Sequence, residues 1–356
     1  MSSKINTAPP PDRTWVMIRH ADPDRPIATF TVLCYNVLCD KYATVNQYSY
    51  CPSWALNWEY RKMSIMKEIR NYEADIITLQ AIGYTGIFSP KSRAKTMNEE
   101  DRKYVDGCAI FWKSDKFEMD REHLIEFTQV VVKKASSSEH MLNRVMPRDN
   151  IALCAVLRIK DNVYANRRLS MAAADNVVGN PLVVCTAHIH WDPEFCDVKL
   201  VQTMMLAHEL HKLLEEVAAQ FRITPQQTPV LICGDLNSLP DSGFRNDACI
   251  EKFSSSIDVG HYSHSLRLDS AVDVNSIPFT NYTYVFSSSN FIKLHILSHQ
   301  FLKICPLSAR LSTLSGFPHP HVPSDHIPIM AQYAVIPTSH QRAPPPPHQA
   351  LPAFPR

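Results

Sequence analysis

Short apolar runs that end at polar residues recur along the chain and predict buried β-strands. The runs are ATFTVLCYNVL, ADIITLQ, VDGCAIFWKSDKF, DNIALCAVLRIK, PLVVCTAHIHWDP, TPVLICGDLNS and IPIMAQYAV. Two other stretches have apolar residues at about every third or fourth position and predict helices. These are residues 197–221 and residues 54–74, the latter with Trp58, Met63, Ile65, Met66 and Ile69 facing inward. Strands mixed with helices predict an α/β sandwich of packed sheets whose functional site lies at one rim.

The remaining segments set the expected domain boundaries. Residues 1–28 are polar and interrupted by proline, so we expect them to be loosely ordered. Residues 29–334 carry the predicted strands and helices as one domain. Residues 335–356 are rich in proline and are predicted to form a disordered tail. The first residues lack an apolar signal region, and no run approaches the length that spans a membrane.

Charge and cysteine usage narrow the class of protein. Lys and Arg total 36 against 35 Asp and Glu, so there is no overall basic field, and any nucleic-acid binding must come from a local cleft. The 10 cysteines lie mostly in apolar runs without CxxC spacing. This usage predicts buried free thiols in a reducing compartment, and therefore a cytosolic or nuclear location.

Candidate chemistry begins with Asp235 and Asn237, which follow the strand VLIC two residues apart. In an extended segment, side chains two apart point to the same side. A carboxylate with a neighbouring amide is able to hold a hard cation or its water and to steer an attacking oxygen. The alternative interpretation of the same pair is an Asx turn that closes the strand.

Other strand ends carry similar polar groups. An SDH tripeptide at residues 324–326 precedes the last strand, and its imidazole and carboxylate are suited to phosphoryl oxygens and a metal or water. His188 and His190 end a middle strand, although a histidine beside Trp191 is equally consistent with a core or rim position. Asn36, at the end of the first core strand, has the same two interpretations.

Taken together, these residues follow the order that defines the endonuclease/exonuclease/phosphatase superfamily of Mg²⁺-dependent phosphodiesterases. From about Thr31 to Tyr333, the chain more closely resembles the carbon-catabolite-repressor-type deadenylases, the poly(A) exonucleases of the Not complex. The resemblance is carried by YNVLCDKYA, YCPSWALNWEYRK, FSPKSRAK, VDGCAIFWK, MLNRVM, HIHWDPEFCDVKLVQTMM, DLNSLPDSG, FTNYTY and PHPHVPSDH.

The resemblance implies a four-layer α/β sandwich of the DNase I type. It also implies hydrolysis of poly(A) from mRNA 3′ ends, in the 3′-5′ direction, with Mg²⁺ and release of AMP. Carried over to matching positions, it implies a metal site at Asn36, Asp235 and Asp325, catalytic roles for Asp235, Asn237, His326 and His188, and substrate contacts from His190, Pro193 and Asn237, with Pro193 against an adenine base.

The chain departs from the family pattern in two segments. Family members continue the strand ITLQ into a glutamate, their main Mg²⁺ carboxylate, and then a helix, whereas here Ala81 follows Gln80. After the NYTY-like motif they carry an aspartate that orients the catalytic histidine, whereas here no acid follows until Asp325. We therefore expect an incomplete sandwich with impaired catalysis. The family's leucine-rich repeats, which dock the partner deadenylase, are also missing from this sequence, and this leaves membership of the Not complex open.

Two other functions stay open on the sequence. One is a noncatalytic RNA-binding or scaffold protein that keeps the cleft without hydrolysis. The other is a sister enzyme acting on dinucleotides or nicotinamide phosphates, against which WALNWEYRK and HWDPE argue. The basic stretch FSPKSRAK is expected to be a solvated surface loop, with phosphate contact as the minority interpretation.

Overall fold

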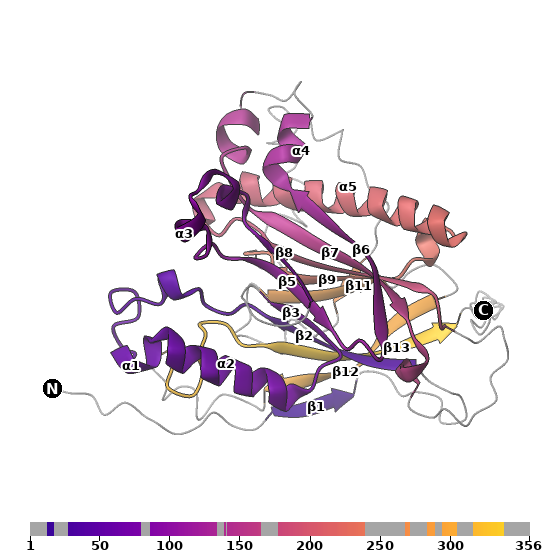
Figure 1. Cartoon of the computed structure of the whole chain (residues 1–356), viewed down its shortest axis with the longest axis horizontal. Helices are drawn as coiled ribbons and strands as arrows, with labels where there is room; N and C mark the ends of the chain where they lie inside the picture. The colour runs from indigo at the N-terminus through magenta and orange to yellow at the C-terminus, as the bar shows by residue number, and fades with distance from the viewer. Residues whose placement is uncertain are drawn as a thin grey trace, which may run out of the picture.

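Two mixed β-sheets form the body of the protein (Figure 1). The computed structural model describes residues 13–17, 28–79, 86–133, 139, 141–164, 177–238, 268–270, 283–288, 294–304 and 316–337. Its strands are β1 (Arg13–Met17), β2 (Ala28–Tyr35), β3 (Ile76–Leu79), β4 (Gly86–Pro90), β5 (Gly107–Trp112), β6 (Phe117–Glu126), β7 (Ile151–Ile159), β8 (Pro181–His188), β9 (Val230–Asp235), β10 (Leu268–Ser270), β11 (Thr283–Ser288), β12 (Leu294–Ile304) and β13 (Ile329–Pro337). The first sheet has the order β1-β12-β13-β2-β3-β5-β4, and the second has the order β10-β11-β9-β8-β7-β6.

Helices connect the strands and cover the outer faces of both sheets. The α-helices are α1 (Ser53–Leu56), α2 (Trp58–Tyr72), α3 (Glu99–Arg102), α4 (Phe127–Lys133) and α5 (Cys196–Phe221). Short helical turns are η1 (Asp40–Tyr42), η2 (Ser92–Thr96), η3 (Met141–Val145), η4 (Asp161–Val163), η6 (Pro193–Phe195) and η7 (Pro225–Gln227). In the described part of the chain, no helix has both the length and the apolar character that a bilayer crossing requires.

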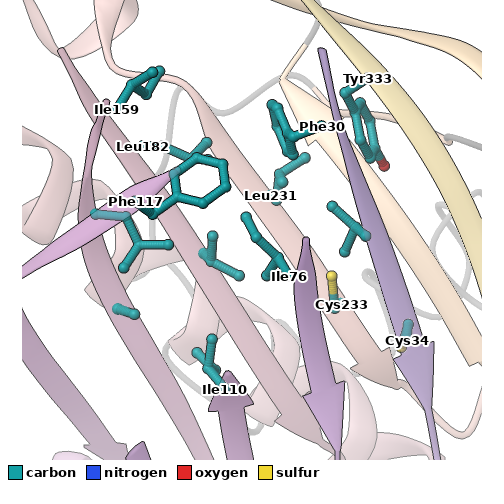
Figure 2. Packing of buried hydrophobic residues seen from close by; sticks show 14 of the residues in the cluster. Phe30, Cys34, Ile76, Ile110, Phe117, Ile159, Leu182, Leu231, Cys233 and Tyr333 are labelled. Carbon is teal, nitrogen blue, oxygen red and sulfur yellow. The ribbon is translucent and has the colours of Figure 1, made fainter. Parts of the chain in front are cut away.

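The main hydrophobic core lies between the two sheets (Figure 2). Because side chains alternate across a strand, β2 contributes Phe30 and Cys34 to this core and Leu33 and Tyr35 to the cluster under α2. The Phe30 ring meets Phe117 of β6 edge-on, with centroids 5.6 Å apart. Burial on both faces explains why these strands read in the sequence as continuous apolar runs.

The outer layers complete four layers of structure. Helix α5 packs through residues such as Val201, Met205 and Leu213 against the second sheet, and α2 packs through Ile65 and Ile69 against the first. Figure 1 shows the two sheets lying between these helices. The predicted α/β sandwich is therefore confirmed.

The helix predicted at residues 54–74 differs in detail. It is interrupted at Asn57, whose side chain caps α2 by accepting a hydrogen bond from the backbone N–H of Glu59 at 3.0 Å. The prediction that Met63 faces inward is wrong, since its side chain is 69% exposed. Positions four apart define the buried face, and Met63 lies about 200° around the helix from the buried Arg61.

The chain ends also differ from expectation where the structure describes them. Residues Arg13–Met17 form β1, which pairs antiparallel with β12, so these five residues of the segment 1–28 are ordered by sheet pairing. Strand β13 ends at Pro337, past the boundary predicted at residue 334. The remaining tail and the segments 80–85 and 279–282, on which the sequence departures partly rest, lie outside the described residues. The predicted buried free thiols are confirmed at Cys34, Cys154, Cys185 and Cys233.

Candidate active site

Three strand ends and one loop meet at one rim of the sandwich. Strands β8 and β9 are parallel, and their pairing places His188 opposite Asp235. Strands β2 and β13 are antiparallel, so the loop that leads into β13 lies beside the end of β2, where Asn36 follows. The stacked sheets thereby bring Asn36 and Asp235 into direct contact, although 199 positions separate them in the sequence.

Asp235 is the centre of this cluster and is only 1% exposed. The Asn36 side-chain amide donates to its Oδ2 at 2.8 Å, and His326 Nε2 lies 3.5 Å from the same oxygen. The backbone N–H of Asn237 donates to Oδ1 at 2.9 Å. Burial raises the pKa of Asp235, while His326 and the two hydrogen bonds oppose that effect. The result is a buried carboxylate surrounded by hydrogen-bond donors at the rim of the fold.

The backbone around Asp235 is tightly turned. Gly234 has φ +129°, and a Cβ there would collide with the Ala187 carbonyl of β8, so only glycine lets the two strands approach. Asn237 has φ +48°, and its hydrogen bond to Asp235 Oδ1 makes the Asx turn that the sequence offered as an alternative. The expectation that Asp235 and Asn237 share a strand face is wrong because β9 ends at Asp235. The Asn237 amide instead donates to the Ile189 carbonyl at 2.8 Å.

Ser324 joins the loop before β13 to the end of β2. Its hydroxyl donates to the Asn36 carbonyl at 2.8 Å and accepts the N–H of Leu38 at 3.0 Å and of His326 at 3.2 Å. The side chain is fully buried. Ser324 therefore fixes the backbone of both Asn36 and His326, a role that the sequence motif SDH did not reveal.

Arg61 also connects the loop after β2 to the loop before β13. It is fully buried on α2, donates through Nε to the Pro323 carbonyl at 3.0 Å, and also donates through Nη2 to the Leu38 carbonyl. The sequence did contain a signal for the burial of Arg61, because it lies four residues before Ile65 and eight before Ile69, on the same face of the helix. Asp325 is engaged separately, since it accepts a hydrogen bond from the Tyr48 hydroxyl at 2.8 Å.

The surroundings of His188 favour its neutral form. Burial lowers its pKa well below the ordinary value, and the nearby Lys91 charge lowers it further, while Asp106 opposes the shift. Lys91 pairs with Asp106 at 2.7 Å. A neutral imidazole beside Asp235 keeps one N–H for donation without adding a positive charge.

The basic stretch FSPKSRAK is an ion-paired structural element, which corrects its expected role as a solvated loop. Arg93 pairs with Asp106 and, at 2.5 Å, with Asp149, while Lys95 pairs with Glu126 at 2.6 Å. These pairs join η2 to β6 and to the loops that precede β5 and β7. The cations are therefore largely neutralised within the protein.

Two buried amides hold the loop that carries His190. The His190 backbone N–H donates to Gln202 Oε1 at 2.9 Å, and Gln202 Nε2 donates to Asn150 Oδ1 at 3.2 Å. Asn150 Nδ2 in turn donates to the His188 carbonyl at 2.8 Å. Gln202 and Asn150 were not among the predicted residues, although polar residues on the apolar side of a helix are a signal for such a role.

Pro193 lies on the rim next to His190. It is exposed at the start of η6, where Asp192 provides the N-cap. The His190 ring packs edge-on against Phe195 at 5.4 Å, and the Arg148 guanidinium lies over the same Phe195 ring at 4.2 Å. Burial, and next the charge of Arg148, lower the pKa of His190. His190 and Pro193 thus flank the Asp235 cluster along the connection between β8 and α5.

The oxygen donors present fit a hard cation that keeps most of its own water. Asp235 and Asn36 are in contact at the rim, and Mg²⁺ is commonly held by one or two carboxylates together with waters and substrate phosphate. Among the described residues, no three His, Cys, Asp or Glu side chains gather into a group able to hold a metal ion. The protein donors therefore suit partial coordination only.

The sequence provides no carboxylate at the end of β3. It contains no acidic residue between Asp75 and Glu99. Asp75 lies at the opposite end of β3, where it pairs with Lys113 at 2.9 Å and Lys116 at 2.8 Å. Asp75 thus has a structural role away from the rim.

Comparison with known proteins places most of the described core in one family. The model of the Endonuclease/Exonuclease/phosphatase family matches residues 33–327. Among solved structures, the crystal structure of ANGEL2, a 2′,3′-cyclic phosphatase, superimposes with a TM-score of 0.60 at 21% identity and covers 91% of this chain and 99% of that chain. At that identity, the likeness supports the fold alone.

Curated relatives are more similar in sequence. The chain is 40% identical over 373 residues to "CCR4-NOT transcription complex subunit 6-like" of Danio rerio, covering 90% of this chain and 66% of that protein. It is 37% identical over 392 residues to "CCR4-Not complex 3′-5′-exoribonuclease subunit Ccr4" of Mycosarcoma maydis, covering 92% of this chain and 55% of that protein. The chain therefore spans about half to two thirds of the length of these two relatives.

Proposed function

The chain belongs to the endonuclease/exonuclease/phosphatase family, and from that premise we propose that it is a 3′-5′ exoribonuclease that shortens poly(A) and releases AMP. The observation that carries the proposal is the buried Asp235, joined to Asn36 and His326 where three strand ends meet. Relatives named as 3′-5′-exoribonuclease subunits at 35–37% identity support this choice of reaction.

The proposed cofactor is Mg²⁺. Asp235 and Asn36 would hold it, with Asp325 as a further carboxylate nearby. When bound, the ion neutralises charge on the phosphodiester and acidifies water for attack. The raised pKa of Asp235 fits this role, because burial disfavours the isolated carboxylate charge and a cation compensates it.

The protein groups supply orientation and hydrogen bonds for in-line hydrolysis. Neutral His188, paired across the sheet with Asp235, offers an N–H to a phosphoryl oxygen, and His326, 3.5 Å from Asp235, offers a second donor. Such donors are most effective when they are fixed in advance and shielded from water. Ser324 provides that fixation for His326, and the Asn150 hydrogen bond provides it for the backbone of His188.

The terminal adenosine is assigned to the connection between β8 and α5. Pro193 offers an exposed flat surface to the adenine, and His190 and Asn237 lie along the same edge.

We expect slower turnover than in relatives that possess the glutamate, since even losing a group that only orients a metal ligand costs about 10–100-fold in activity or metal affinity. The relatives' names make a CCR4-Not assembly the proposed partner. The free buried thiols support the proposed cytosolic or nuclear location.

The test is a shortening assay with 5′-fluorescein-labelled oligo(A) and Mg²⁺. We expect a ladder of products one nucleotide apart, lost on adding EDTA and in the Asp235→Asn variant, but kept in a Met63→Ala control on the exposed face of α2. Binding of oligo(A) without shortening would instead favour the noncatalytic RNA-binding alternative. Shortening that survives Asp235→Asn would show that another site performs the reaction.

A further inference from the structure

A cavity of about 440 Å³ lies on the side of the first sheet, and one of its walls is formed by the loop that follows β2. We propose that it holds the base of an RNA nucleotide on the 5′ side of the bond that is cut, an inference that rests on the proposed exonuclease function. The volume is within the range of small-molecule sites, about 300–1,000 Å³.

The walls are suited to a planar base. Trp58 at the start of α2, Phe88 of β4 and Tyr104 after α3 line the cavity together with Met97. Phe88 is 44% exposed and Tyr104 is 73% exposed, so neither side chain is buried in the protein core. Aromatic rings exposed in a hollow are the surfaces on which single-stranded nucleic acid stacks its bases.

Two lining residues link the cavity to the segments that carry the candidate active site. Its wall includes Cys39, three positions beyond Asn36, and Asp106, whose partner Lys91 acts on His188. None of its described lining residues comes from the connection between β8 and α5 that carries Pro193. The cavity therefore provides a base position separate from the one assigned to the terminal adenosine.

The charged residues of the wall balance one another: Asp40, Asp101 and Asp106 stand against Lys41, Arg93 and Lys103. Arg93 and Lys103 are already paired with carboxylates, Lys103 with Glu100 at 2.9 Å. Lys41 is exposed on the same wall, and in the described part of the chain it has no carboxylate partner within ion-pair distance. Lys41 is therefore available to contact one phosphate, while the aromatic side chains of the cavity contact the neutral base joined to it.

The test measures binding separately from hydrolysis. Fluorescence anisotropy with 5′-fluorescein-labelled A10 in EDTA gives the Kd of wild type, Phe88→Ala, Tyr104→Ala and Trp15→Ala. Trp15 is the matched control because it is 40% exposed and lies on β1, the opposite edge of the same sheet from β4. We expect Kd to rise about tenfold in each cavity variant and to stay unchanged in Trp15→Ala.

Two further readouts identify the bound group. AMP has no upstream nucleotide, so its affinity, measured by calorimetry, is expected to be the same in wild type and in both cavity variants. Lys41→Gln is expected to lower the dependence of log K on log salt by about one phosphate contact. This variant tests the cavity even if loss of Phe88 disturbs β4.

The possible outcomes distinguish the two proposals. Weaker A10 binding in the cavity variants without hydrolysis by wild type would support the cavity and contradict the exonuclease. Normal shortening with equal A10 affinity in all variants would overturn the cavity alone. An equal loss of AMP affinity in the cavity variants would also overturn it, because the cavity would then serve the terminal nucleotide.

Discussion

Replacing Arg61 by methionine tests how the site is held together. Arg61 is a fully buried cation that donates to the carbonyls of Leu38 and Pro323, one on each loop that carries the site. Burial lowers its pKa, and the charges of Asp40 and Asp325 oppose that shift. Methionine keeps the apolar stem and removes both hydrogen bonds.

The magnitude follows from the contacts. Hydrogen bonds from a charged donor contribute about 1.5–3 kcal/mol each, so two contribute about 3–6 kcal/mol. Arg61 Nη1 has no hydrogen-bond partner among the described residues, and removing that buried donor returns about 1–3 kcal/mol. The expected net loss is therefore about 3 kcal/mol. At about 2–4 °C per kcal/mol, Tm should fall by roughly 6–12 °C.

Differential scanning fluorimetry measures the change, with Arg70→Met as the control because Arg70 is exposed on the same helix. We also expect oligo(A) shortening to fall at temperatures where the variant is fully folded, since Asn36 and His326 lose their common support. A Tm within roughly 2 °C of the Arg70→Met value, about the effect of a surface substitution, would refute the reasoning.

Two further predictions concern the strand that carries Asp235. Its raised pKa means that the buried charge costs stability once the pH exceeds the ordinary aspartate value of 3.8, and the cost is complete above the raised pKa. Asp235→Asn should therefore raise Tm at pH 7 and abolish hydrolysis. The Tm difference between the variant and wild type should shrink as the pH falls toward 3.8. A Tm difference that does not depend on pH would contradict this explanation. Gly234→Ala should cost ~3 kcal/mol or more by urea denaturation, because a left-handed φ is combined with a collision against Ala187. Gly179→Ala, with φ +84° and open space, should cost only about 1 kcal/mol, and equal losses would argue against the collision.

Local patterns in the sequence were sufficient to predict an α/β sandwich of packed sheets, whereas its four layers were implied by the family resemblance. Strands such as β2 and β9 are buried on both faces, which makes them continuous apolar runs, and α5 repeats its apolar residues with the helical period. The helix at residues 54–74 was harder to predict, because the cap at Asn57 and the buried Arg61 depend on partners elsewhere in the fold. β1 was missed because only its pairing with β12 orders it.

The sequence by itself determined which polar residues end the core strands, because an apolar run that stops at Asn36, His188 or Asp235 shows where each strand leaves the core. Only the tertiary structure decided how they meet. The stacking of two sheets puts Asn36 against Asp235, and the turn at Asn237 directs its amide toward Ile189. These contacts span long separations along the chain and depend on backbone geometry, so periodicity and motif spacing carry no information about them.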